Sequence, residues 1–279
     1  MNKIKLLVDG GCDLPENILE KYNIELVGLN VSFNDESYIA GVEIDNETFY
    51  KKMSESKELP KTSCPSPDRF LEAYKGDEDV LIITVSSLLS GTYSSAKLAK
   101  DMYEDKNSNK KIEVLDSMSG SIGQGLLAIK AAELINEGKN LDEIVSILEK
   151  LKNDVIFYGT LETLENAIKG GRINPLAGKL INALNFKAII QVTEGVVKPI
   201  DKARGVNNSL KKVLEYVESN IKNVDEKILV IAHAHCEDKA SKIKESLEIK
   251  YKFKDIIIAE IGPVMGTYTS QGAILISSL

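Results

Sequence analysis

Seven serine and threonine residues gather in the segment TVSSLLSGTYSSA, which starts at Thr84, where a hydrophobic strand is expected to lead into a helix. One hydroxyl at a helix start normally accepts a backbone N–H of the first turn. The N–H groups of that turn also attract anions, helped by the helix dipole. If Ser87 or Ser90 caps the start of the expected helix, the role of the Thr92 hydroxyl stays unexplained. An anion site and a capped, solvated turn both stay open for this segment.

Two further segments carry residues suited to binding an anion. The loop PKTSCPSPDRF (60–70) has three prolines that would hold Thr62 and Ser63 in fixed positions, and Pro67 suits the first turn of a helix. In KGGR, the glycine pair indicates a left-handed helix end, followed by Arg172. A guanidinium there is either a carboxylate or phosphate clamp or a surface charge. Taken alone, a Pro-rich connector and a surface arginine are the commoner cases.

Several enzyme motifs are incomplete in this sequence. INPLAGKL lacks the first glycine and the final Ser or Thr of a P-loop, and SGSIG has Ser119 where a hydrolase elbow needs glycine. His233 and His235 alternate along an expected strand and so should point to one face. Together with Cys236 they suggest a metal, but the sequence offers no further Cys or His cluster. We therefore expect neither catalytic residues nor a metal site.

Composition limits the class of protein further. The 279 residues are 43% hydrophobic and 28% charged, typical of a globular protein, and the net charge of −7 argues against nucleic-acid binding. We expect no membrane span, because no apolar run is long enough, and no signal peptide, because the N-terminus enters a strand-like pattern at once. Three scattered cysteines favour a cytoplasmic location.

The order of elements predicts an α/β fold with two domains. In residues 1–153, the strands IKLLVD, VLIITVS and KIEVLDS alternate with helical segments, the pattern of a parallel sheet. Small polar residues follow each of these strands, at the sheet edge where ligands of such folds bind. Residues 154–279 predict a second domain with a mixed sheet, including a hairpin that turns at Glu194-Gly195.

Together, these motifs resemble the DegV family of bacterial fatty-acid-binding proteins. TSCPSP matches the family element TSxPSP, and SSLLSGTYSSA matches SSxLSGTYxSA throughout. DSMSGSIGQG, KGGRI and IGPVMGTYTSQGA follow in the family order, so that the resemblance runs essentially from end to end. The first two motifs together are highly specific.

The resemblance implies a parallel α/β/α layered domain, a smaller mixed-sheet α/β domain and one long-chain fatty acid between them. The protein would be a carrier without a cofactor, and a separate ATP-dependent fatty acid kinase would convert the presented acid to an acyl phosphate. The residues that match the family's head-group motifs are Thr62, Ser63, Ser87, Ser90, Gly91 and Arg172.

Two departures from the family pattern concern this site. Most relatives read GTHTGPGA near the C-terminus, whereas this chain reads GTYTSQGA, with Tyr268 in place of the histidine. A tyrosine hydroxyl can donate to a carboxylate but carries no positive charge near neutral pH. The first turn has Gly10 and Gly11 where relatives usually have a Ser-Thr pair. The first departure leaves open whether kinase exchange, acyl preference or the ligand class itself differs from that of the family.

Simple magnitudes agree with a fatty acid as the ligand. Burial of each CH₂ contributes about 0.8 kcal/mol, whereas a hydrogen bond to a charged head group contributes about 1.5–3 kcal/mol. The tail would supply most of the affinity, and the surplus hydroxyls would form a socket for the head. The expected tail contacts are Leu88, Leu89, Ile122 and Leu126.

Two other functions remain open from the sequence. One is an enzyme acting on a small phosphorylated or carboxylated substrate, with Ser87 or Ser90 as nucleophile or anion binder. The other is a structural or regulatory interaction protein. Stabilisation by phosphate esters, by fatty acids or by neither would distinguish the three.

Overall fold

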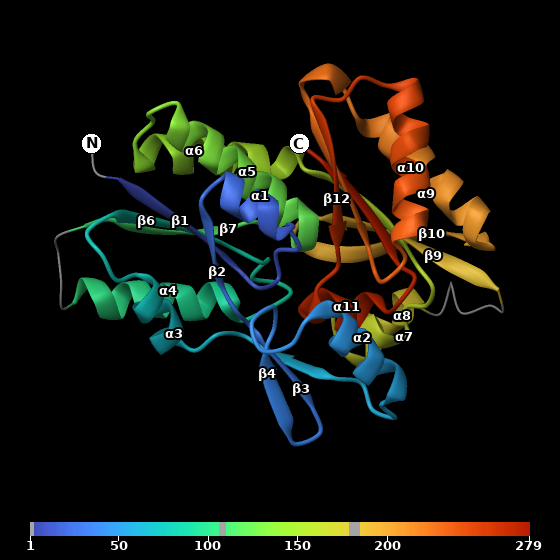
Figure 1. Cartoon of the computed structure of the whole chain (residues 1–279), viewed down its shortest axis with the longest axis horizontal. Coiled ribbons are helices and arrows are strands. Elements are labelled where there is room, and N and C mark those ends of the chain that lie inside the picture. The colour runs from blue at the N-terminus through green and yellow to red at the C-terminus, as the bar shows by residue number, and fades with distance from the viewer. Residues whose placement is uncertain (1–2, 106–109, 179–184) are drawn as a thin grey trace.

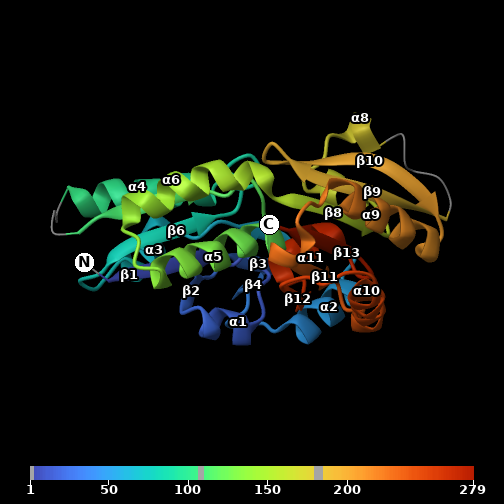
Figure 2. The same ribbon diagram turned by 90° about the horizontal axis from the view of Figure 1, so that it is seen from above.

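The computed structural model describes residues 3–105, 110–178 and 185–279, and its two main sheets lie side by side (Figures 1 and 2). The first sheet has the strand order β2-β1-β6-β7, and all of its pairs are parallel. The bounds are β1 Ile4–Asp9, β2 Ile24–Val27, β6 Asp79–Thr84 and β7 Ile112–Asp116. The predicted parallel sheet is therefore confirmed.

Helices cover both faces of this sheet (Figure 1). On one face lie α5 (Ser121–Asn136) and α6 (Leu141–Leu151), and on the other lie α3 (Pro67–Ala73) and α4 (Thr92–Glu104). Helix α3 begins with Pro67 in its first turn, as the sequence indicates. Because both faces of the sheet are buried, its strands are apolar without alternation, which gives the predicted α/β/α layers.

A small antiparallel sheet that the sequence did not predict lies below the parallel sheet in Figure 1. Its order is β4-β3-β5, with β3 Asn30–Phe33, β4 Glu36–Ile39 and β5 Lys61–Ser63. These strands have three or four residues each, too short for a clear apolar pattern. Two further helices belong to the first half of the chain: α1 (Glu16–Lys21), which contacts β2, and α2 (Asn46–Glu55), which contacts α11.

The second half of the chain forms a six-stranded mixed sheet with the order β10-β9-β8-β13-β11-β12. Only β11 and β12 pair in parallel within this sheet. The strands are β8 Ile156–Leu161, β9 Phe186–Thr193, β10 Val196–Arg204, β11 Ile228–His233, β12 Asp255–Glu260 and β13 Ile274–Ser278. The β9–β10 hairpin turns at Glu194 and Gly195, both with positive φ, as predicted.

Helices α9 (Val206–Asn220) and α10 (Glu237–Lys250) pack on this mixed sheet. Three short helices complete this half: α7 (Glu165–Lys169) and α11 (Pro263–Thr269), which contact each other, and α8 (Pro175–Gly178), which contacts α7 and β10. Single 3₁₀ turns occur at Lys152–Asp154 and Val224–Glu226.

One hydrophobic core crosses the junction between the two sheets. It includes Leu6 and Val8 of β1, Ile122 of α5, and Ile190 and Leu275 of the mixed sheet. The strands of the parallel sheet all precede residue 117, and those of the mixed sheet all follow residue 155. A division into domains 1–153 and 154–279 stays a prediction.

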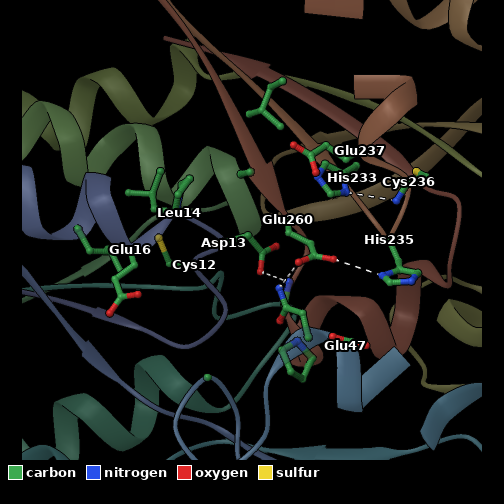
Figure 3. A pocket seen from close by; sticks show the side chains of 18 of the residues that line it. Cys12, Asp13, Leu14, Glu16, Glu47, His233, His235, Cys236, Glu237 and Glu260 are labelled. Carbon is green, nitrogen blue, oxygen red and sulfur yellow. Dashed lines mark hydrogen bonds and ion pairs between the residues drawn. The ribbon is translucent and has the colours of Figure 1, made fainter. Parts of the chain in front are cut away.

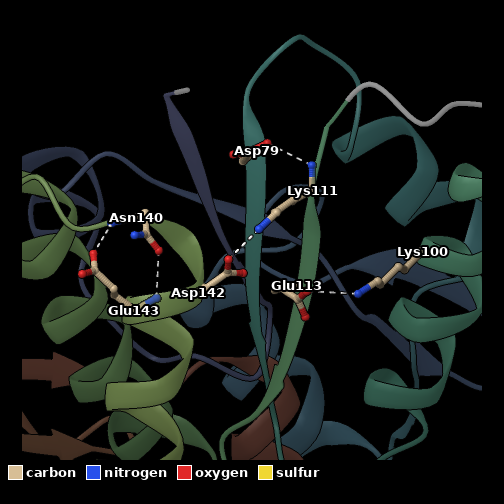
Figure 4. A network of polar contacts seen from close by, with 7 residues as sticks. All are labelled: Asp79, Lys100, Lys111, Glu113, Asn140, Asp142 and Glu143. Atoms are coloured by element: carbon tan, nitrogen blue, oxygen red, sulfur yellow. Dashed lines mark hydrogen bonds and ion pairs between the residues drawn. The ribbon is translucent and has the colours of Figure 1, made fainter. Parts of the chain in front are cut away.

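Charged residues are paired at the amino edge of the parallel sheet (Figure 4). Lys111 donates its backbone N–H to Asp79 and its ammonium group to Asp142 of α6, over 2.9 and 2.5 Å. Asn140 and Glu143 form a capping box at the start of α6. The opposite, carboxyl edge carries the small polar turns and is the edge that meets the second half of the chain.

Within the described part of the chain, no helix is both long and apolar enough to span a membrane.

Candidate functional site

A narrow apolar cavity of about 90 Å³ lies where the carboxyl edge of the parallel sheet meets the mixed sheet and α11. Both halves of the chain contribute to its wall. The described lining residues are Leu29, Thr62, Val85, Leu89, Ser90, Leu161, Ala167, Arg172, Ile173, Ile190, Val197, Val264, Met265, Tyr268 and Thr269. The cavity therefore brings together three residues that match the family motifs, Thr62, Ser90 and Arg172. It also includes Tyr268, which stands where most relatives have a histidine.

Tyr268 of α11 joins two of these residues at the polar end of the cavity. Its hydroxyl lies 2.5 Å from Thr62 Oγ1 of β5, and the Arg172 guanidinium lies 4.6 Å from the centre of its ring. A β-carbon at Gly170 would lie 2.4 Å from Tyr268 Cε1, so only glycine lets the ring occupy this place. The first glycine of KGGR therefore makes room for Tyr268, and Gly171, with φ +76°, ends α7 as predicted.

Arg172 connects the GGR turn to the serine-rich turn after β6. Its Nε donates to the Leu89 carbonyl over 3.2 Å, and Nη1 donates to the Gly170 carbonyl over 2.5 Å. Guanidinium has five N–H donors in a fixed plane. These two bonds fix the direction of that plane at the cavity wall.

The structure explains most of the hydroxyls after β6 without a ligand. Ser86 Oγ donates to the Gly195 carbonyl of the β9–β10 hairpin over 2.7 Å, and Ser95 Oγ donates to the Pro65 carbonyl over 2.6 Å. Ser90 Oγ lies 2.8 Å from Thr92 Oγ1, and Thr92 is fully buried. From this cluster only Ser90 presents a hydroxyl to the cavity wall. The surplus hydroxyls mainly join loops, and the expectation that they form a head-group socket stays a prediction.

Three predicted site residues, Ser63, Ser87 and Gly91, are not among the described residues that line the cavity. Ser63 follows Thr62 in β5 and so points to the opposite face, where it accepts from Asn30. Ser87 is exposed, and its backbone N–H donates to Asp116. Gly91 is the residue before α4 and is exposed.

The structure places the expected tail contacts differently relative to this cavity, and their contact with a ligand stays a prediction. Leu89 does line the cavity, but Leu88 points outward with 61% of its surface exposed. Ile122 and Leu126 belong to the buried core on α5. The sequence analysis missed Val197 and Met265, which reach the cavity from the β9–β10 hairpin and from α11. The motif IGPVMGTYT carried the only sequence signal for Met265.

Two buried aspartates hold the turns around the cavity in place. Asp9 accepts the N–H groups of Gly11 and Val85, over 2.8 and 2.6 Å, and so joins the turns after β1 and β6. Asp13 accepts the Ser121 hydroxyl over 2.5 Å and the Gly262 N–H over 2.9 Å, which fixes the start of α11. Burial raises the pKa of Asp9 to about 6 and that of Asp13 to about 7.

A second, wider concavity of about 1340 Å³ lies on the other side of α11 (Figure 3). Its wall carries acidic side chains that include Glu16, Glu47, Glu237 and Glu260. We call it the acidic groove. It is open and charged, in contrast to the apolar cavity.

Both histidines line the acidic groove, but they do not lie on one face of a single strand as predicted. Strand β11 ends at His233, and His235 follows with φ +52°, so that the two side chains do not alternate along one strand. His235 Nδ1 lies 3.6 Å from Glu260 Oε1, whereas burial lowers the pKa of His233. In the described ranges, no three His, Cys, Asp or Glu side chains are placed to hold a metal ion.

Comparisons with known proteins agree with this architecture. A family model described as "Uncharacterised protein, DegV family" matches residues 3–279. A DegV domain-containing protein of Clostridium perfringens is 33% identical, over 99% of this chain and 97% of the relative. A DegV family structure from Ruminococcus gnavus, refined with vaccenic acid, has a TM-score of 0.92 and 31% identity, with 99% and 100% of the two chains covered.

A third match is the Streptococcus pneumoniae Fatty Acid Kinase (Fak) B3 protein loaded with linoleic acid. It has a TM-score of 0.87 and 26% identity, with 99% and 98% of the two chains covered. The chain described here belongs to the DegV family. Both of these solved relatives are described with a bound fatty acid.

Proposed function

We propose that the chain binds one long-chain fatty acid in the apolar cavity and presents its carboxylate to an ATP-dependent fatty acid kinase. The observation that carries the proposal is the cavity itself, which has apolar walls and a single polar end. That end combines the hydroxyls of Thr62, Ser90 and Tyr268 with the guanidinium of Arg172. The solved relatives that were described with vaccenic and linoleic acid support the ligand class.

The hydroxyl pairs leave hydrogens for a carboxylate. In the Thr62–Tyr268 pair one hydroxyl donates to the other, so the accepting hydroxyl keeps its own hydrogen. Ser90, which lines the cavity, keeps its hydrogen for a ligand when Thr92 is the donor of the Ser90–Thr92 pair. Arg172 adds the positive charge that Tyr268 lacks. Such a site would hold the head group by donors from several elements.

The cavity must widen to accept a long acyl chain. Its volume of about 90 Å³ is well below the roughly 300–1,000 Å³ of pockets that enclose drug-sized ligands. The walls are mostly side chains rather than backbone, so separation of these side chains is the cheapest route to a longer cavity. The acidic groove is large enough, but its carboxylates would repel the head group.

The test has two stages. Displacement of a fluorescent fatty acid should show saturable binding of oleate and palmitate, with no competition by short phosphate esters. The oleate-loaded chain, a fatty acid kinase and MgATP should then give an acyl phosphate that hydroxylamine traps, and omission of the chain should abolish the product. Competition by phosphate esters without binding of either fatty acid would instead favour an enzyme with a small anionic substrate.

A further inference from the structure

Met265 of α11 lines the cavity and reaches turns at the carboxyl edge of the parallel sheet. The terminal methyl of Met265 lies against the turns after β1 and β7: a β-carbon at Gly120 would be 2.8 Å from Met265 Cε, and one at Gly11 would be 3.1 Å away. Val85 borders the same place, since a β-carbon at Gly120 would be 3.2 Å from its Cγ2. We call this place, bounded by Gly11, Gly120 and Val85, the glycine slot.

The wall of the glycine slot is rigid. Ser121 donates its backbone N–H to the Gly11 carbonyl over 2.8 Å, which joins the two turns directly. Ser86 donates its N–H to the Ser119 carbonyl over 2.7 Å. Gly120 has φ −164°, an extended conformation that any residue adopts, so its lack of a side chain serves the contact with Met265 rather than the backbone.

Met265 is also the lining side chain that moves most easily. Methionine is unbranched, has three rotatable bonds and adapts to irregular spaces. Most of the other apolar lining residues are branched valines, isoleucines and leucines, and Tyr268 is held by Thr62 and Arg172. A rotation of Met265 out of the glycine slot would join the slot to the cavity without any change in the backbone.

We propose that Met265 limits the length of the acyl chain, because carbons of the chain enter the glycine slot only when its thioether leaves. The inference rests on the proposed function, since it assigns a selectivity residue to the same cavity. Tyr268 lies one helical turn after Met265, so Met265 sits about one turn along α11 from the polar end. Substitutions at Met265 and at Gly120 should therefore act in opposite directions.

The test measures Kd for saturated fatty acids of increasing length. In the wild type, affinity should rise about fourfold for each added CH₂ until the chain no longer fits. Met265→Ala should extend this rise by about two or three carbons, an increase of at least about tenfold in relative affinity for the longest acids. Gly120→Ala, which fills the glycine slot and pushes Met265 into the cavity, should end the rise at a shorter chain.

The chain length at which affinity stops rising is the length limit. The double variant Met265→Ala/Gly120→Ala should return this length limit toward that of the wild type. Met118→Ala is the matched control, because Met118 is not among the described lining residues, and its limit should equal that of the wild type. An unchanged limit in folded Met265→Ala, with tight binding in the wild type, would overturn this inference and leave the proposed function standing. Absence of any fatty-acid binding to the wild type would overturn both.

Discussion

Helix α11 separates two concave regions of opposite chemistry. On one side lies the apolar cavity of about 90 Å³, with Arg172 as the charged residue among its described lining. On the other side lies the acidic groove of about 1340 Å³, whose wall includes Asp13, Glu237 and Glu260 (Figure 3). The larger concavity has the wrong charge for an anionic lipid. Chemical character, rather than volume, is therefore the basis on which we propose the binding site.

The largest effect on oleate binding should come from a substitution that fills the apolar cavity, compared with a matched substitution at the acidic groove. Val197→Trp places a bulky ring in the cavity and should weaken oleate binding by more than about 100-fold, because the tail supplies most of the affinity. Val42→Trp makes the same change at the wall of the acidic groove, at a residue that is 70% exposed, and should leave binding unchanged. Isothermal titration with oleate measures both. The reverse pattern would assign the ligand to the acidic groove.

A smaller effect is expected from the charge at the polar end. Arg172→Gln removes the positive group while its amide can still reach nearby carbonyls, and should weaken oleate binding by about 10–150-fold, equivalent to about 1.5–3 kcal/mol. Lys169→Gln is the matched control, since this lysine is exposed and pairs with Glu165. The same titration gives both values. Equal losses in the two variants would mean that general surface charge, and not the position of Arg172, attracts the ligand.

The smallest effect concerns stability and the buried aspartates next to α11. Both carboxyls have a folded pKa above the ordinary value of 3.8, so their contribution to stability is complete below about pH 3.8 and is lost as the pH rises through about 6 for Asp9 and about 7 for Asp13. Between pH 6 and pH 8, Asp13 should account for a loss of about 1 kcal/mol in the free energy of unfolding.

Asp13→Asn removes this titration and keeps an oxygen that can accept the Gly262 N–H. Urea unfolding at pH 6 and pH 8 should therefore show a weaker pH dependence in Asp13→Asn than in the wild type. Taking the difference between the two proteins cancels contributions from His233 and other groups. The same pH dependence in both would show that Asp13 is ionised throughout this range.

The sequence predicts the elements of this fold well because their signals are local. Apolar runs followed by small residues mark β1, β6 and β7, and the pair Glu194-Gly195 marks a tight hairpin. The KGGR segment ends a helix at Gly171 for the same reason, since glycine adopts a positive φ at little cost. The small β4-β3-β5 sheet escaped prediction because its strands are too short to show a period.

The lining of the cavity could not be predicted in the same way. Leu29, Val197 and Met265 meet from three distant segments, whereas Ile122, close to the polar turns in sequence, is buried in the core. The residues next to a serine in the sequence also do not show its hydrogen-bond partner. Ser86 donates to the Gly195 carbonyl, 109 residues later in the chain. Family motifs located Thr62, Ser90 and Arg172 but assigned similar importance to Ser63 and Ser87, which lie outside the cavity lining.

The most direct test of the central claim is a crystal structure of the chain with 9,10-dibromostearic acid, whose bromine atoms give anomalous peaks. We predict bromine peaks between the two sheets, within the cavity lined by Ile190 and Met265, and carboxylate density within hydrogen-bonding distance of Thr62 or Tyr268 and of Arg172. Bromine peaks in the acidic groove, or a cavity that stays closed at saturating ligand, would contradict the account.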